Sequence, residues 1–138
     1  IFIWVEQGQG LRIMLKQILK NGNLGEIITL IKNNQNDYMP KNSELYQNYP
    51  NPFNPVTTIT YQLPVASKVR LEIYNILGQK VRTLVDAQQP AEYYTIQWDG
   101  KNDHGRQVGS GLYIYRLITE TADGGERFVK ARKMLLIR

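Results

Sequence analysis

The sequence contains no cysteine and only one histidine, and it has no apolar run near the roughly 18 to 20 residues of a transmembrane helix. The missing cysteines exclude disulfides and thiolate metal sites, so the packing of apolar side chains must hold the fold. The histidine, His104, lies in a glycine-flanked stretch and is expected to be a solvent-exposed turn residue rather than a catalytic base. Glu72, Glu92 and Glu120 are scattered and suggest no paired-carboxylate site. We therefore predict that the chain is not an enzyme.

Two further ligand-binding signals are incomplete. The stretches "GQG" near the start and "GSG" at 109–111 lack the glycine and lysine spacing of a phosphate-binding loop. Asp99, Asn102 and Asp103 resemble a fragment of a calcium loop, but the glycine position and the distant bidentate glutamate of that motif are missing. We interpret this stretch as a turn stabilised by aspartate side chains, and we predict no catalytic, cofactor or metal site.

Positive charge is in excess and is concentrated near the end of the chain. The net charge is +5, and residues 127–138 contain no acid while carrying Arg127, Lys130, Arg132, Lys133 and Arg138. Such a stretch could bind nucleic acid electrostatically. Basic residues that alternate with Val129, Ala131 and Met134 are more typical of one solvated face of an edge strand. We therefore expect no nucleic-acid partner.

The first 38 residues differ from the rest in the spacing of their apolar residues. The stretch "LRIMLKQILK" at 11–20 has the apolar spacing of an amphipathic helix, and residues 24–33 fit a helix or a strand almost equally. Residues 33–43 are polar and asparagine-rich, which is typical of a linker. The chain begins with Ile, and "IFIWV" is too short for a signal-peptide apolar region. We expect the sequence to be the end of a longer protein, with residues 1–38 an extension or the end of a cargo region.

Beyond residue 56 the apolar residues recur with period two. The stretches "TTITYQL", "KVRLEIYN" and "EYYTIQWD" alternate apolar and polar residues, as half-buried strands do. "LYIYRLITE" is largely apolar on both faces, which indicates a central strand, and "ADGG" at 122–125 predicts a hairpin turn before a returning strand. Six or seven short strands with turns between them, and no helix after residue 45, predict an all-β fold, an antiparallel β-sandwich.

A stretch rich in proline and asparagine, "NYPNPFNP", precedes these strands. Proline lacks an N–H and disfavours a helical conformation in the residue before it, so this segment cannot be a helix or a central strand. We predict a stiff, hydrated and extended strap that lies along a sheet edge or serves as a rigid linker. Its residues of interest are Asn48, Pro50, Asn51, Pro52, Phe53, Asn54 and Pro55.

Taken together, four stretches carry a family resemblance. "ELYQNYPNPFNPVTTITYQLP", "VRLEIYNILGQKVRTLV", "YYTIQWDGKNDHGRQVGSGLYIYRL" and the final "KARKMLLIR" resemble, in collinear order from about residue 39 onward, the C-terminal sorting domain (type A) of type IX secretion cargo. A related domain is the immunoglobulin-like domain of the flagellar hook-capping protein. The resemblance implies an immunoglobulin-like sandwich of roughly seven strands at 57–138, with residues 39–56 as linker and strap.

The resemblance also implies a function. Domains of this family, from the Bacteroidetes and related phyla, direct an upstream cargo domain through an outer-membrane export machine, and a sortase-like peptidase removes some of them. The chain is therefore expected to be secreted or held at the cell surface, without a transmembrane segment. Tyr113, Tyr115 and Leu117 would face the core beside Trp98. The sorting signal would lie in the final hairpin, with candidates Gly111, Tyr113, Tyr115, Lys130, Lys133 and Leu135.

Two other functions remain open at this point. Nine tyrosines suggest a carbohydrate-binding or adhesive sandwich, in which exposed rings such as Tyr93 would stack on sugars. The hook-capping relative suggests instead a structural immunoglobulin-like spacer in a flagellar-type assembly. Effects on export, on glycan binding or on assembly would separate the three hypotheses.

Overall fold

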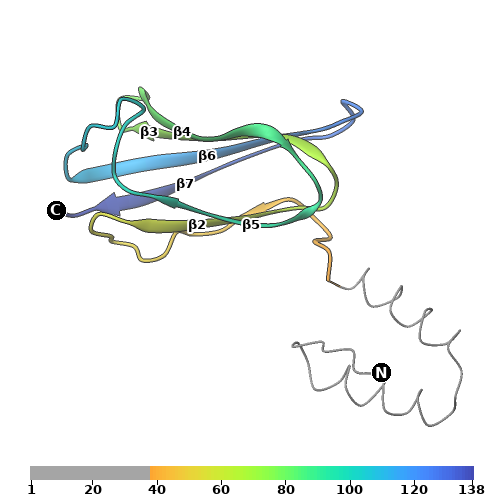
Figure 1. Ribbon diagram of the computed structural model, residues 1–138, viewed down its shortest axis with the longest axis horizontal. Helices are drawn as coiled ribbons and strands as arrows, with labels where there is room; N and C mark the ends of the chain where they lie inside the picture. Colours follow the sequence, from red (N-terminus) through yellow and green to blue (C-terminus); the bar gives the residue numbers. More distant parts are fainter. Residues whose placement is uncertain (1–37) are drawn as a thin grey trace, which may run out of the picture. The chain divides into compact units, whose positions relative to one another are not determined.

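The computed structural model describes residues 38–138, of which Met39 to Arg138 form a compact unit (Figure 1). The helix expected at 11–20 and the helix or strand expected at 24–33 lie outside the described residues. Within residues 38–138 there is no helix, and so none that could span a membrane.

Seven strands form two antiparallel sheets, which confirms the predicted sandwich. The strands are β1 (Glu44–Leu45), β2 (Thr57–Leu63), β3 (Ser67–Asn75), β4 (Lys80–Gln89), β5 (Glu92–Trp98), β6 (Gly111–Thr121) and β7 (Arg127–Leu136). One sheet has the order β1-β2-β5 and the other the order β4-β3-β6-β7, stacked face to face in Figure 1. The segment assigned to a linker thus contributes a short strand, because Glu44 and Leu45 pair with Gln62 and Tyr61.

The alternating pattern of the sequence is reproduced in the burial of the strands. In β3, Val69 and Leu71 face the core while Lys68 and Arg70 are exposed. β6 lies between β3 and β7, as its apolar composition predicted. Such strands form because one side of the pleat is removed from water while the other remains solvated.

Glu72 departs from this pattern. It lies on the outer face of β3, as predicted for a strand exterior, yet it is only 6% exposed. Cationic side chains cover its carboxylate: Arg70 Nε lies 3.1 Å away, and Lys80 Nζ and Arg116 Nη2 each lie 3.7 Å away. A buried carboxylate needs such partners, and three strands supply them here.

Trp98 occupies the centre of the core. Its ring is fully buried, with the Phe53 ring 5.6 Å away and the Tyr113 ring 5.3 Å away in an edge arrangement. The Trp98 indole N–H donates to the carbonyl of Lys101 at 2.9 Å. Tyr115 and Leu117 are also buried, so the predicted aromatic core is confirmed.

The face assignment of β7 was wrong for its basic residues. The inward set is Phe128, Lys130, Arg132, Met134 and Leu136, whereas Val129 and Ala131 are exposed. Lys130 and Arg132 are half-buried because both reach β1, where Lys130 pairs with Glu44 and Arg132 donates to a backbone carbonyl. Inward-pointing charges on an edge strand disfavour pairing with another chain.

Candidate functional site: the strap and the final hairpin

The strap at Asn48 to Pro55 is not a hydrated linker throughout. Asn48 and Phe53 are buried, while Asn51, Asn54, Pro50 and Pro52 are exposed. The peptide bonds preceding Pro50, Pro52 and Pro55 are cis. Tyr49 bridges antiparallel to Thr58, and Phe53 bridges parallel to Leu136, so the segment turns back on itself instead of running as one extended strap.

Asn48 closes this turn from the inside. Its Nδ2 donates to Thr57 Oγ1 at 2.8 Å and to the carbonyl of Pro50 at 3.2 Å, and Thr57 Oγ1 donates to the same carbonyl at 2.9 Å. The backbone N–H of Asn48 donates to the Tyr115 hydroxyl at 2.8 Å. An asparagine side chain has the donors and the acceptor needed to satisfy a buried turn.

Tyr115 connects the strap to the core. Its hydroxyl donates to the carbonyl of Tyr46 at 2.7 Å while accepting from Asn48. Burial raises the pKa of Tyr115 to about 12, although the Asn48 hydrogen bond acts in the opposite direction. The hydroxyl therefore stays protonated at neutral pH and can donate.

Phe53 ties the strap to the last strand. Its N–H donates to the carbonyl of Leu135 at 3.0 Å, and its carbonyl accepts from Ile137 N–H at 2.9 Å. Asn51 Oδ1 accepts from Leu135 N–H at 2.9 Å. The expected position along a sheet edge is therefore found at the end of β7, with the Phe53 ring as the anchor in the core.

β1 and the residues after it are joined to β7 by a second set of contacts. Lys130 pairs with Glu44, Arg132 Nε donates to the carbonyl of Leu45 at 2.7 Å, and Gln47 Nε2 donates to the carbonyl of Lys133 at 2.8 Å. The Lys130 hydrogen bond lowers the pKa of Glu44, and the Leu45 N–H adds to the effect. Sequence reasoning missed these contacts because their partners are separated by more than 80 residues.

The structure places the six sorting-signal candidates in different environments. Tyr113 and Tyr115 are core residues, and Lys130 is turned toward Glu44. Gly111 begins β6. Only Lys133 and Leu135 present their side chains outward from β7, so the candidates do not form one surface.

The loop between β5 and β6 uses its acidic and amide side chains for turns. Asn102 Oδ1 accepts from the N–H groups of His104 and Arg106 at 3.0 Å, and Asp103 Oδ1 accepts from Thr83 N–H at 3.0 Å. His104 is exposed, as predicted. Residues 38–138 contain no group of three or more His, Cys, Asp or Glu side chains that could hold a metal ion.

Arg138 is a structural residue that the sequence did not single out. Its Nη2 donates to the carbonyl of Gly100 at 2.9 Å and its Nε to the carbonyl of Val108 at 2.8 Å. Its backbone N–H donates to Ser110 Oγ at 2.9 Å. The left-handed conformation of Gly100, with φ +71°, allows the chain to approach this guanidinium closely.

A comparison with known families decides the identity of the sandwich. The family described as FlgD Ig-like domain matches residues 54–123, which is half of the chain. The chain belongs to the FlgD Ig-like domain family. The matched residues end at Asp123, so β7 and most of the strap lie outside the matched range.

Three solved structures are similar to parts of this chain. Dimeric latent PorU from Porphyromonas gingivalis is 23% identical, over 69% of this chain and 9% of PorU, with a TM-score of 0.57. FlgD from P. aeruginosa is 26% identical, over 58% of this chain and 59% of FlgD, with a TM-score of 0.47. PorZ from Porphyromonas gingivalis, a surface component of the type IX secretion system, is 20% identical, over 68% of this chain and 11% of PorZ, with a TM-score of 0.42. The FlgD Ig-like domain thus spans about a tenth of the Por proteins, and no curated protein matches its sequence.

Proposed function

We propose that this FlgD Ig-like domain is a non-catalytic sorting module, which directs an upstream cargo domain through type IX secretion to the cell surface or the medium. Its partners would be the outer-membrane export machinery and a sortase-like peptidase. The proposal draws first on the resemblance of residues 39–138 to the sorting domain of type IX cargo.

One structural observation supports this role. The strap and β7 are hydrogen-bonded to each other through Phe53 and Leu135, and both segments extend beyond the match to the FlgD Ig-like family. The strap and the terminal strand therefore form one connected unit in the region where the sorting signal is expected. A sorting signal that is recognised through protein–protein contacts needs a defined surface and no catalytic cavity.

A reporter fusion tests the proposal. An exported reporter joined upstream of the full chain, in a bacterium with type IX secretion, is expected to reach the surface or the medium. Deletion of residues 130–138 is expected to retain the reporter in the periplasm, but it also removes the buried Met134 and Leu136 and so disrupts the fold. Point variants are needed for that reason.

Two exposed candidates provide these variants. Lys133→Glu and Leu135→Ser change outward side chains and are expected to reduce export without unfolding the sandwich. Lys41→Glu and Ile76→Ser are matched controls at exposed positions away from β7. Wild-type export of the folded β7 variants, or failure of the unaltered fusion to leave the periplasm, would refute the proposal.

A structural spacer is the second candidate function, because the family match itself is to the immunoglobulin-like domain of FlgD. This function predicts that the protein co-purifies with a flagellar-type assembly and that the reporter is not exported. Glycan binding has less support. Tyr94 stacks on Tyr61 with ring centroids 5.2 Å apart, and Tyr113 and Tyr115 lie in the core, so these rings are not available as a sugar platform.

A further inference from the structure

The outer face of β6 and β7 combines exposed apolar side chains with an excess of cations. Cross-strand neighbours lie on the same face of a sheet, so Leu112 lies beside Leu135 and Ile118 beside Val129. Leu112, Leu135 and Val129 are 40%, 37% and 52% exposed. Leu112 and Leu135 thus form an exposed apolar pair, and further along β7 the exposed Val129 lies beside Ile118, which is only 8% exposed. Exposed apolar side chains rimmed by polar residues are typical of an interaction surface.

Cations are interleaved with these apolar residues on the same face. Lys133 lies beside Ile114, and Arg116 beside Ala131. Arg127, the first residue of β7, lies on the same face and is exposed. The two carboxylates on this face are already engaged, since three cations surround Glu72, and Glu120 lies 3.6 Å from Arg127. The face therefore presents a positive field with apolar contacts within it.

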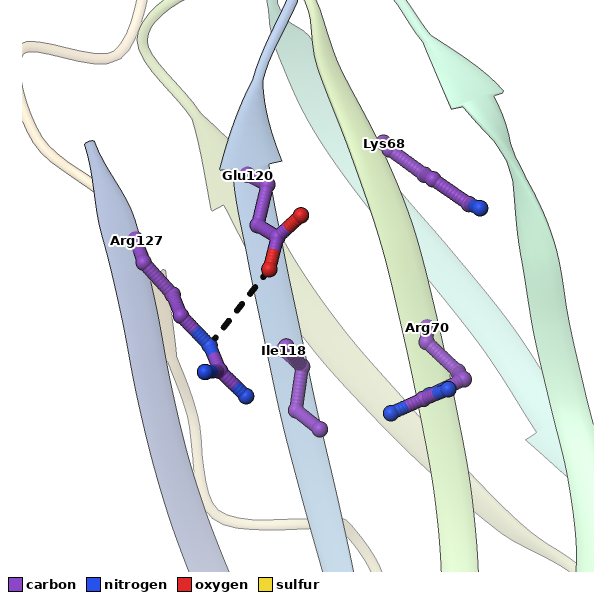
Figure 2. A pocket seen from close by; sticks show the side chains of 5 residues that line it. All are labelled: Lys68, Arg70, Ile118, Glu120 and Arg127. Carbon is purple, nitrogen blue, oxygen red and sulfur yellow. Dashed lines mark ion pairs between the residues drawn. The ribbon is translucent and has the colours of Figure 1, made fainter. Parts of the chain in front are cut away.

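A shallow hollow of about 90 Å³ marks one end of this face (Figure 2). Its lining residues are Lys68, Arg70, Ile118, Glu120 and Arg127, so three cations face one carboxylate, which lies 3.6 Å from Arg127 Nε. Figure 2 shows the guanidinium groups of Arg70 and Arg127 approaching Ile118 from opposite sides. Arg70 also pairs with Glu72, with its Nε 3.1 Å from Glu72 Oε1. Two guanidinium groups on either side of an apolar side chain suit a carboxylate carried on an aliphatic stem.

We infer that the outer face of β6 and β7 is a docking surface for a protein partner that carries carboxylates next to apolar side chains, with the hollow at Ile118 receiving one carboxylate. Charge complementarity and the exposed Leu112, Val129 and Leu135 side chains identify this partner chemistry. A nucleic acid would need cations that follow a phosphate backbone, whereas here Val129, Leu135 and Leu112 interrupt them. A role of this surface in export rests on the proposed function. Its binding of a partner is tested independently of export.

The test uses the full chain and a defined probe. The probe is a short blocked peptide in which two leucines are flanked by glutamates, and its counterpart has glutamine in place of glutamate. Amide chemical shifts of the isotope-labelled chain are expected to move on β6, β7 and around Ile118 with the glutamate peptide. The glutamine peptide is expected to bind about tenfold more weakly.

Matched variants separate this surface from general charge. The double variant Arg127→Gln with Lys133→Gln is expected to weaken the glutamate peptide about tenfold, because both cations lie on this face. Lys41→Gln with Arg106→Gln removes the same charge from exposed positions elsewhere and is expected to have little effect. Val129→Ser is expected to weaken binding, whereas Val65→Ser, at a similarly exposed valine in the β2–β3 turn, is not.

Four results would overturn the inference: no shifts on β6 and β7 at saturating peptide, equal weakening by both double variants, equal binding of both peptides, or tighter binding to vesicles of anionic phospholipid than to the glutamate peptide. The last would assign the face to a membrane surface. Failure of reporter export with intact peptide binding would count only against the proposed function.

Discussion

Single residues allow the strap and the C-terminal residues to pack closely, and Gly100 is one of them. The left-handed conformation at Gly100 brings the backbone close to Arg138 and Pro55, and a Cβ there would lie 3.0 Å from Arg138 Nη2 and 3.3 Å from the Pro55 carbonyl oxygen. Gly105 has a similar φ of +76°, but a Cβ at that position would meet nothing within 4 Å. The two glycines therefore have similar backbone conformations but differ in the space available for a Cβ atom.

This difference gives a first prediction. Gly105→Ala is expected to lower the free energy of unfolding by about 1–2 kcal/mol, the cost of a left-handed conformation for an L-residue. Gly100→Ala is expected to cost about 1–3 kcal/mol more, because the new methyl group must displace Arg138 or the strap. Urea denaturation of both variants measures the difference. Equal losses would show that the close approach to Arg138 carries no energy.

Phe53 supports a second prediction at the same scale. Phe53→Ala removes a buried ring that contacts Trp98 and is expected to cost about 3–5 kcal/mol, with a change in Trp98 fluorescence. Tyr49→Ala, at an 80% exposed position of the same strap, is the control and is expected to change stability by no more than about 0.5 kcal/mol. Similar stability of the two variants would mean that the strap is a mere linker.

At the scale of elements, β1 is a two-residue strand whose place depends on β7. Its contacts with β7 include the Lys130–Glu44 pair and the Arg132 hydrogen bond to Leu45. The pKa of Glu44 is lowered in the folded protein, so the pair stabilises the fold above the ordinary glutamate pKa of 4.5. That contribution is lost as the pH falls through the lowered pKa.

The third prediction follows from the lowered pKa of Glu44 in the folded protein. Glu44→Gln is expected to lower the Tm at neutral pH, and the difference from the unaltered chain is expected to shrink as the pH falls below about 4. Glu126→Gln removes the same charge from an exposed turn and is expected to show no such pH-dependent difference. Thermal unfolding across this pH range is the measurement, and a difference that persists in acid would contradict the role of the pair.

The same elements show what the sequence could predict. Alternation in "TTITYQL" and "KVRLEIYN" predicted β2 and β3 because each has one solvated and one buried face. It failed for Lys130 and Arg132, whose partners on β1 lie far away in the chain. A signal was present: Met134 and Leu136 share the parity of Lys130 and Arg132, so an inward Met134 requires these two cations to point inward as well.

The docking face and the strap were less predictable still. The candidate residues Lys133 and Leu135 lie in the final hairpin, but the face that they occupy is completed by Ile118, Val129 and Leu112 through the strand register. Register depends on the turn at 122–125 and on the pairing of β3 with β6. Neither the burial of Phe53 nor the closure of the strap by Asn48 leaves a local pattern in the sequence, because both depend on side chains brought from the far end of the chain.

At the scale of the whole molecule, two buried phenols link stability to pH. Burial raises the pKa of Tyr61 and of Tyr115 to about 12. The two hydroxyl groups donate hydrogen bonds to Gln89 Oε1 and to the Tyr46 carbonyl. A raised pKa means that the protonated form is favoured in the folded state. The stabilisation is therefore complete below the ordinary tyrosine pKa of 10.0 and is lost as the pH rises toward 12.

The fourth prediction is an alkaline loss of stability. The free energy of unfolding is expected to fall between about pH 10 and 12, with the ultraviolet absorbance of tyrosinate rising late for these two residues. Tyr115→Phe is expected to make the fall shallower, although it weakens the fold at neutral pH by removing two hydrogen bonds. Tyr93→Phe, at an exposed ring, is the control. An unchanged slope in Tyr115→Phe would contradict the assignment.

The parallel bridge between Phe53 and Leu136 has a mechanical consequence. When tension is applied at Met39 and Arg138, two parallel segments pulled from opposite ends slide past each other, so their hydrogen bonds are loaded in shear and must break together rather than one by one. Forced unfolding depends on the height of that kinetic barrier and not on equilibrium stability. A force applied at these two points is therefore resisted at the junction of the strap with the end of β7.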